Sequence, residues 1–421
     1  MSSDGAFLAA AESIGRRVLA DAVWHDGRCG WVGAVANPAE PWRPKYQALE
    51  ASLYDGTAGV GLFLAQLAAV TGDAAVHRTA LGALRHAIEA ASEMPVSAGD
   101  GLHAGTLGIA WAAARAAALL DEPELYAGAR AIAAAEQPTS APGRCPDVIE
   151  GAAGAIVALL ALADALAEPT LVEAAIATGE ELIGRATATR HGLIWTVVDR
   201  PHRRQLCGLS HGAAGIGWAL LELFAATGDE RFRSAATGAF AYERSWLDAG
   251  SGTWPDLRIG GQRRAARSRI ASPAVGTWCH GEAGIALTRL RAIDVLGPEP
   301  WLDEADLAIE TTRRELATAL PYEIDDLTLC HGAAGAADVL LCAATLGERW
   351  EGAARLASEL AHAALERYGR SGQEWPCGMA GTSPNLFRGL SGIGWWLLRL
   401  EDATIPSPLM PMWLTAAAGR A

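Results

Sequence analysis

Long apolar segments alternate with segments of mixed polarity along the whole chain. The apolar segments are rich in Ala and Leu, contain no proline and carry little charge, as in 59–70 and 215–223. A helix that is apolar on all sides is typical of a buried position. The segments between them, such as 77–93, 171–185 and 301–320, combine charged and apolar residues at helical spacing, which predicts helices with one face in solvent. The pattern therefore predicts alternating inner and outer helices.

A glycine-rich turn precedes each apolar segment. A Gly-x-x-Gly sequence recurs seven times, with its first glycine at positions 56, 105, 151, 212, 281, 332 and 389. The intervals of 46 to 69 residues give room for two helices and two loops, and a period of this size is typical of repeat architectures. Because 47 of the 421 residues are glycine, the shared context of these turns counts for more than their number.

Seven inner helices and about seven outer helices predict an all-α fold. We expect an α/α toroid of two concentric helical rings, formed by a single domain over residues 1–421. Glycine permits positive φ and close backbone approach, so all seven inner helices can begin crowded around one axis. The residues just before the turns should then converge in one layer of the fold.

Polar and metal-binding side chains are concentrated in this converging layer. The residue immediately before each first glycine is Asp55, Ala104, Glu150, His211, His280, His331 or Arg388. The residue one position earlier is Tyr54, His103, Ile149, Ser210, Cys279, Cys330 or Phe387. The layer is therefore the expected place of a functional site.

Two Cys-His dipeptides in this layer occupy matching frames. Cys279-His280 and Cys330-His331 are each preceded by Thr and one apolar residue, and each is followed by the turn glycine. A single buried Cys or His is usually a packing residue, but two copies in equivalent places favour a metal site. Thiolate and imidazole are ligands that zinc prefers, and three of them leave a fourth position open for water or substrate. The motif predicts a catalytic zinc.

Composition and charge exclude several other functions. The net charge of −14 argues against a nucleic-acid partner, and the absence of a run of ~18 uncharged apolar residues argues against membrane insertion. The N-terminus lacks the basic region and apolar core of a signal peptide, so we expect a cytoplasmic protein. Seven widely spaced cysteines favour reduced thiols over a disulfide framework. Those outside the Cys-His dipeptides are interpreted as packing residues: Cys29, Cys145, Cys207, Cys342 and Cys377.

From about residue 50 onward the chain resembles the lanthionine synthetase C-like cyclases, including the C-terminal cyclase domain of class II lanthipeptide synthetases. The motifs that carry the resemblance are Leu53-Tyr54-Asp55-Gly56, Asp147-Val148-Ile149-Glu150-Gly151, Ser210-His211-Gly212, Tyr242-Glu243-Arg244, Trp254-Pro255-Asp256-Leu257-Arg258, Trp278-Cys279-His280-Gly281 and Leu329-Cys330-His331-Gly332. The resemblance implies an α/α toroid with a central Zn²⁺ held by Cys279, Cys330 and His331. It also implies an acid/base pair, His211 and Asp147. Such enzymes add peptide cysteine thiols to dehydroalanine or dehydrobutyrine and so form lanthionine or methyllanthionine rings.

The chemistry of these residue types suits that reaction. Zinc deprotonates a bound thiol, and imidazole titrates near neutral pH, so His211 can accept a proton from the thiol and protonate the enolate that follows addition. Asp147 would hold the His211 tautomer. Purely structural roles stay open for both residues. His211 could cap a helix or lie in the core, and Asp147 could cap the third inner helix. His280 would close the open zinc position as a fourth ligand, so we predict that it lies behind the ligands or faces the substrate.

The partners and the substrate are less determined by the sequence. The fused class II enzymes carry a dehydratase domain that this chain lacks, so we expect a separate dehydratase and a dehydrated precursor peptide as partners. Addition of glutathione or another thiol to dehydrated residues is the alternative reaction. A non-catalytic peptide-binding scaffold is a third hypothesis. It predicts that a metal ligand or the acid is missing, whereas the sequence contains all of them. Arginines between Arg258 and Arg269 form a basic loop that would either steer an acidic peptide or serve as a solvated connection.

Overall fold

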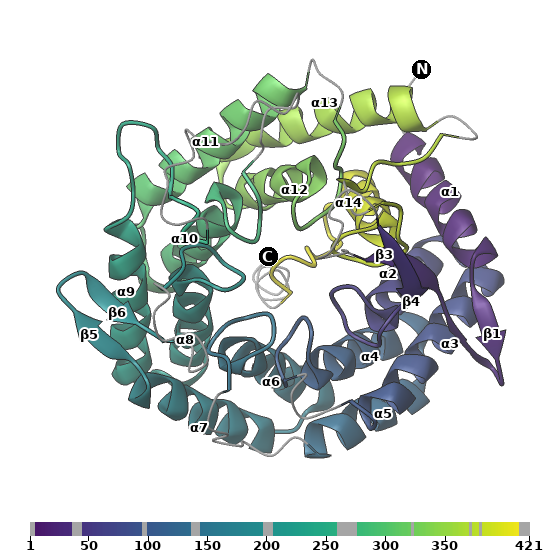
Figure 1. Cartoon of the computed structure of the whole chain (residues 1–421), viewed down its shortest axis with the longest axis horizontal. Helices are drawn as coiled ribbons and strands as arrows, with labels where there is room; N and C mark the ends of the chain where they lie inside the picture. The colour runs from purple at the N-terminus through teal and green to yellow at the C-terminus, as the bar shows by residue number, and fades with distance from the viewer. Residues whose placement is uncertain are drawn as a thin grey trace.

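Two concentric rings of helices form the molecule (Figure 1). The computed structural model describes residues 5–35, 44–94, 99–135, 144–196, 205–258, 276–320, 324–369, 373–378 and 381–411. The inner ring consists of α2 (Thr57–Thr71), α4 (Thr106–Leu120), α6 (Ala152–Leu166), α8 (Ala213–Thr227), α10 (Glu282–Leu296), α12 (Ala333–Ala344) and α14 (Leu390–Glu401). The outer ring consists of α1 (Ala6–Ala20), α3 (Ala74–Ala91), α5 (Pro123–Ala135), α7 (Thr170–Gly184), α9 (Glu230–Arg244), α11 (Leu302–Ala319) and α13 (Glu351–Tyr368). The predicted α/α toroid is confirmed.

The burial of the helices follows the polarity of their sequences. In α6 every residue from Ala152 to Leu160 is buried, whereas α3 buries one face through Val76, Ala80, Ala83 and Ala87. The ring closes where α14 packs against α2 and the first outer helix, α1, packs on α14. No helix in the described part of the chain is both long and apolar enough to cross a membrane. The expectation of a single domain stays a prediction.

Each inner helix begins at one of the turn glycines. The first glycine of every turn is the N-cap residue, and its backbone is extended with negative φ, as at Gly332, where φ is −95°. The expected positive φ is therefore wrong for these seven residues. Close approach is the reason for glycine: a Cβ at Gly332 would collide with the backbone nitrogen of Thr328, and one at Gly335 with the carbonyl oxygen of Leu329.

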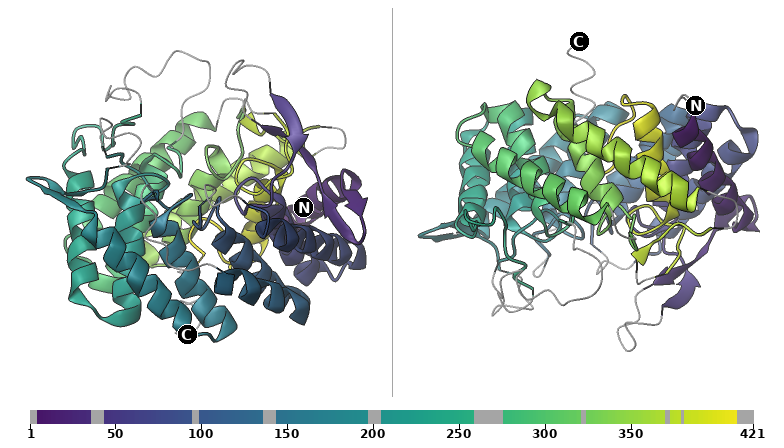
Figure 2. Two further views of the ribbon diagram at one scale, coloured as in Figure 1. Left: turned by 60° about the horizontal axis from the view of Figure 1, so that its bottom comes forward. Right: turned by 90° about the horizontal axis from the view of Figure 1, so that it is seen from above.

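Three short antiparallel strand pairs in the described residues lie outside the predicted helical pattern. They pair β1 (Val23–His25) with β2 (Arg28–Gly30), β3 (Val32–Val35) with β4 (Lys45–Ala48), and β5 (Thr187–Thr189) with β6 (Gly192–Ile194). Asp26 and Gly27 form the first tight turn with φ of 46° and 74°. Strand β2 packs on α3 and strand β6 packs on α9. The β1–β2 and β5–β6 pairs therefore lie against the outer ring (Figure 2).

Backbone hydrogen bonds join neighbouring turns at the end of the inner ring where the helices begin. The N–H groups of Tyr54, His103, Val148, Ser210, Cys330 and Phe387 donate to the carbonyl oxygens of His103, Ile149, Ser210, Cys279, Phe387 and Tyr54, respectively, at 2.9 to 3.2 Å. The converging layer is therefore a hydrogen-bonded ring. Within the described residues, one seam of this ring has no such bond, and it lies between the turns that carry Cys279 and Cys330.

Candidate metal centre and active site

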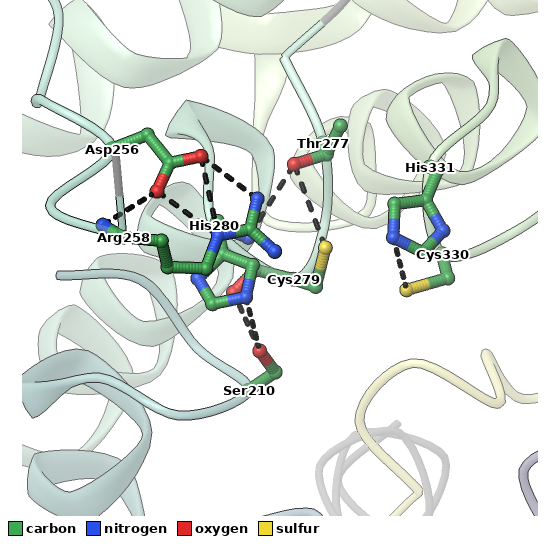
Figure 3. Close-up of polar contacts among 8 residues, drawn as sticks. All are labelled: Ser210, Asp256, Arg258, Thr277, Cys279, His280, Cys330 and His331. Atoms are coloured by element: carbon green, nitrogen blue, oxygen red, sulfur yellow. Dashed lines mark hydrogen bonds and ion pairs between the residues drawn. The ribbon is translucent and has the colours of Figure 1, made fainter. Parts of the chain in front are cut away.

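The open seam of the ring is where the structure gathers three metal-binding side chains. One ligand atom each of Cys279, Cys330 and His331 lie within 4.8 Å of one another, and Cys330 Sγ is 3.8 Å from His331 Nε2 (Figure 3). A tetrahedral zinc with bonds of about 2.3 Å to sulfur and about 2.0 Å to nitrogen separates sulfur and nitrogen ligands by about 3.6 Å. The donor set and its spacing therefore fit zinc.

The predicted ligands differ in exposure, which gives the cluster a closed side and an open side. Cys279 and Cys330 are buried at the ends of the neighbouring helices α10 and α12, while His331 is exposed. Three protein ligands leave the fourth coordination position of a tetrahedral zinc open. Because His331 is exposed, a substrate atom can reach that position, as a catalytic zinc site requires.

The two thiols are strongly coupled. Hydrogen bonds from Cys330 and His331 hold the pKa of the Cys279 thiol well below its usual value, although burial opposes this. Burial and the neighbouring Cys279 raise the pKa of the Cys330 thiol well above its usual value. The protein alone thus favours one thiolate, and a divalent cation would stabilise both.

His211 and Asp147, the predicted acid/base pair, are in direct contact. His211 Nδ1 lies 2.5 Å from Asp147 Oδ2, and the Asp147 carboxylate is buried while the His211 side chain is 38% exposed. Burial lowers the pKa of His211, but the hydrogen bond and charge of Asp147 outweigh it and raise the pKa overall. With Nδ1 bonded to the carboxylate, Nε2 is the nitrogen available to a substrate.

Asp147 also organises its own turn. Its Oδ1 accepts a hydrogen bond from the backbone N–H of Glu150 at 3.0 Å, and the Cys145 thiol donates to Oδ2 at 3.2 Å. The turn-capping role left open by the sequence is therefore present together with the contact to His211. Cys145 is not only a packing residue, because its thiol shares an oxygen with the His211 ring.

His280 belongs to the histidine side of the site. Its ring stacks on that of His211 with centroids 5.6 Å apart and an interplanar angle of 27°, and its Nε2 lies 3.4 Å from Ser210 Oγ. It is buried, and burial lowers its pKa to about 4, so it is neutral at pH 7. His280 lies outside the three-residue cluster, and its role behind the ligands or facing the substrate stays a prediction.

Two further family motifs hold the turn that carries His211. Glu243 is fully buried, accepts a hydrogen bond from the backbone N–H of Gly208 at 2.7 Å and lies 3.0 Å from the Arg289 guanidinium. Trp254 donates its indole N–H to the carbonyl oxygen of Glu243 at 3.1 Å. Burying a carboxylate costs free energy unless it is paired and hydrogen-bonded, as Glu243 is here. These residues therefore support the site without entering it.

Sequence reasoning missed the contact that Tyr54 makes with the metal cluster. Tyr54 Oη donates to Cys330 Sγ at 2.8 Å. Burial and the charge of Cys330 raise the pKa of Tyr54 well above its usual value, so the phenol stays protonated. Its position directly before the Asp55-Gly56 turn was the available signal. Of the basic loop, Arg258 binds Asp256 through two nitrogens at 2.7 to 3.2 Å, and residues 259–275 lie outside the described residues.

The fold and the site define a class of protein: an α/α toroid with a Cys₂His cluster beside a His-Asp pair at the ends of its inner helices. Residues 47–414 match the family described as lanthionine synthetase C-like protein, and the chain belongs to that family. No curated protein matches the chain.

Solved structures share the fold at low sequence identity. Nisin cyclase matches with a TM-score of 0.59 at 20% identity, over 87% of this chain and 91% of that chain. The Lin0763 protein from Listeria innocua matches with a TM-score of 0.50 at 12% identity, over 94% of this chain and 97% of that chain.

Proposed function

We propose that this protein is a zinc-dependent cyclase that forms thioether rings in a dehydrated precursor peptide. The observation that carries the proposal is the placement of the Cys279, Cys330 and His331 cluster and the His211–Asp147 pair in one layer of the toroid. Membership of the lanthionine synthetase C-like family and the similarity in fold to nisin cyclase support it.

The cluster supplies what a thiol nucleophile needs. Cys279, Cys330 and His331 would hold the zinc, and the metal would lower the pKa of an incoming cysteine thiol so that it reacts as a thiolate at neutral pH. The exposure of the His331 imidazole supports access of a peptide side chain to the open side of the cluster.

His211 would move the proton. Its Nε2 accepts the proton of the cysteine thiol, and the sulfur then bonds to the β-carbon of dehydroalanine or dehydrobutyrine. The electron pair of the alkene moves to the α-carbon and its carbonyl group, and the imidazolium returns the proton to the α-carbon. The hydrogen that leaves sulfur is thus replaced on carbon, and no other reactant is needed. Asp147 stabilises the imidazolium between the two transfers, as its 2.5 Å contact with Nδ1 allows.

The neutral His280 ring fits beside this pair. Because its pKa is about 4, it adds no second positive charge next to the His211 imidazolium. Its stacking on His211 and its contact with Ser210 support the orientation of the catalytic ring.

The decisive experiment supplies the purified protein with zinc and a synthetic peptide that contains dehydroalanine and a free cysteine. Cyclisation leaves the peptide mass unchanged but removes the free thiol, so alkylation followed by mass spectrometry measures it. With the zinc-loaded protein we expect the peptide to lose its free thiol and to escape alkylation. After chelation of the zinc we expect the peptide to be alkylated as before. A second arm offers a dehydrated peptide without cysteine together with glutathione. Addition only in that arm would assign the protein to intermolecular thiol addition, and binding without reaction in either arm would leave a scaffold role.

A separate dehydratase is the expected source of the dehydrated residues, and we propose it as a partner. Co-purification with such an enzyme and its precursor peptide tests this part of the proposal independently of the cyclisation assay.

A further inference from the structure

The two cysteines of the cluster differ in the use of the threonine that stands two residues before each. Thr277 Oγ1 lies 3.6 Å from Cys279 Sγ (Figure 3). Thr328 has the same place relative to Cys330, but its hydroxyl donates to Asp326 Oδ1 at 2.7 Å. The matching frames in the sequence therefore do not give both sulfur atoms the same neighbour.

Tyr54 supplies the hydroxyl that Thr328 does not. Its Oη donates to Cys330 Sγ at 2.8 Å, although the two residues are 276 positions apart in the chain. A thiolate has only acceptor sites and the phenol is protonated at neutral pH, so the direction of this hydrogen bond is defined. At the other sulfur, the Cys279 thiol donates to Thr277 Oγ1, which also accepts from the backbone N–H of His280 at 3.4 Å. When a metal deprotonates Cys279, the sulfur becomes an acceptor and the Thr277 hydroxyl can donate to it.

The Tyr54 hydroxyl is placed by a rigid frame. The Tyr54 ring stacks on Phe387 with centroids 5.0 Å apart and an interplanar angle of 14°. The backbone N–H of Phe387 donates to the carbonyl oxygen of Tyr54 at 3.0 Å, and that of Cys330 donates to Phe387 at 2.9 Å. Stacking and two backbone hydrogen bonds thus connect the hydroxyl to the sulfur it contacts. A phenylalanine would keep the stacking, so packing alone does not explain the hydroxyl.

We propose that Tyr54 and Thr277 are positioning residues of the metal centre, each donating one O–H···S hydrogen bond to a protein thiolate, Tyr54 to Cys330 and Thr277 to Cys279. The inference rests on the proposed zinc site and deepens it. Hydrogen bonds to ligand atoms orient them and reduce the electron density that they give to the metal. The protein sulfurs become weaker nucleophiles, and the reaction is left to the sulfur of the substrate.

Cobalt substitution tests this directly, because Co²⁺ bound by thiolates has charge-transfer absorption bands that report the electron density on sulfur. Loss of a hydrogen bond to a thiolate raises its electron density and moves these bands to lower energy. We expect this shift in Tyr54→Phe and in Thr277→Val, measured on the full chain loaded with Co²⁺ alone. We also expect zinc to dissociate about 10-fold more readily from each variant in competition with a chelating dye, because the loss of orientation of the sulfur outweighs its greater electron density.

Tyr368→Phe is the matched control. It removes a phenol hydroxyl that donates to the carbonyl oxygen of Ile324 at 2.8 Å on the outer helix α13, and it should leave the bands and the zinc affinity unchanged. Bands and affinities equal to wild type in both test variants would overturn the inference. If Tyr54→Phe fails to fold, Thr277→Val decides alone in the same way. A wild-type protein that binds no Co²⁺ refutes the proposed zinc site itself, whereas wild-type thiolate bands that neither variant moves refute only this inference.

Discussion

The proposed metal side and the proposed proton-transfer side of the site are built differently. On the metal side, both cysteines and His331 come from two neighbouring turns, and Cys330 and His331 are adjacent in sequence. On the proton-transfer side, His211 and Asp147 are 64 residues apart and meet only because successive turns join in the hydrogen-bonded ring. The Cys-His frame is therefore a local pattern that occurs twice in the sequence, whereas the proposed acid/base pair joins two different motifs, and the ring brings the members of both sets together.

The two sides meet at one dipeptide. Cys279 belongs to the metal cluster, and the next residue, His280, stacks on His211. If the two sides nevertheless act separately, loss of a side chain on the proton-transfer side should leave zinc binding unchanged. Variants of single side chains can test that separation.

The largest effect is expected from Cys330→Ala. Removal of one of three ligands should reduce the zinc content from about one per chain to near none and abolish cyclisation. Native mass spectrometry measures the metal, and Cys29→Ala, which changes a buried cysteine outside the site, is the control. Full zinc occupancy in Cys330→Ala would contradict the assignment of the ligands.

His211→Asn should separate the two sides most clearly. We expect the zinc content to remain at the wild-type value, while the rate of cyclisation falls about 10²- to 10⁴-fold because general acid/base help is lost. The rate at saturating zinc measures this, with the exposed His25→Asn as control. Loss of zinc together with the rate would show that His211 supports the metal and that the division is wrong.

Asp147→Asn should produce a smaller loss of rate and a change in pH dependence. The charge and hydrogen bond of Asp147 raise the pKa of His211, so the variant should move the His211 limb of the pH–rate profile to lower pH. The Asp147 carboxyl has a lowered pKa, because the hydrogen bond from His211 outweighs the burial that raises it. NMR titration of His211 and the pH–rate profile measure the shift, and an unchanged pKa would contradict the pairing.

The same two shifts predict how the pair contributes to folding stability. The lowered pKa of Asp147 gives stability that is lost as pH falls through that pKa. The raised pKa of His211 gives stability that is present below its unfolded pKa and lost as pH rises through the folded pKa. Urea unfolding of the wild type should therefore show a greater pH dependence on both sides of this window than Asp147→Asn.

The smallest effect is expected from Cys145→Ala. It removes the thiol that donates to Asp147 Oδ2, so the oxygen becomes a stronger acceptor for His211 and the His211 pKa should rise slightly. We expect a change in rate of about threefold or less, in line with the loss of one weak neutral hydrogen bond. The control is Cys377→Ala, whose thiol contacts the backbone of Trp375 instead. A loss as large as that of His211→Asn would place Cys145 in the proton transfer itself.

The sequence by itself determined the seven buried helices, the glycine at which each begins, and the two Cys-His frames, because these features depend on residues close together in the chain. The family motifs in the sequence also predicted that Asp147 contacts His211. The hairpins were missed because strands of three or four residues leave little periodicity.

Only the tertiary structure decided which polar groups meet across the ring. Tyr54 reaches Cys330 from the opposite end of the chain because α14 packs against α2 and closes the toroid. The two threonines differ for a local reason, because Asp326, two residues before Thr328 in the chain, accepts the Thr328 hydroxyl, whereas a valine stands at the matching position before Thr277. A repeated motif specifies the backbone of a turn. The partner of each side chain depends on the residues beside the motif in the chain, as for Thr328, and on what other turns place next to it, as for Cys330.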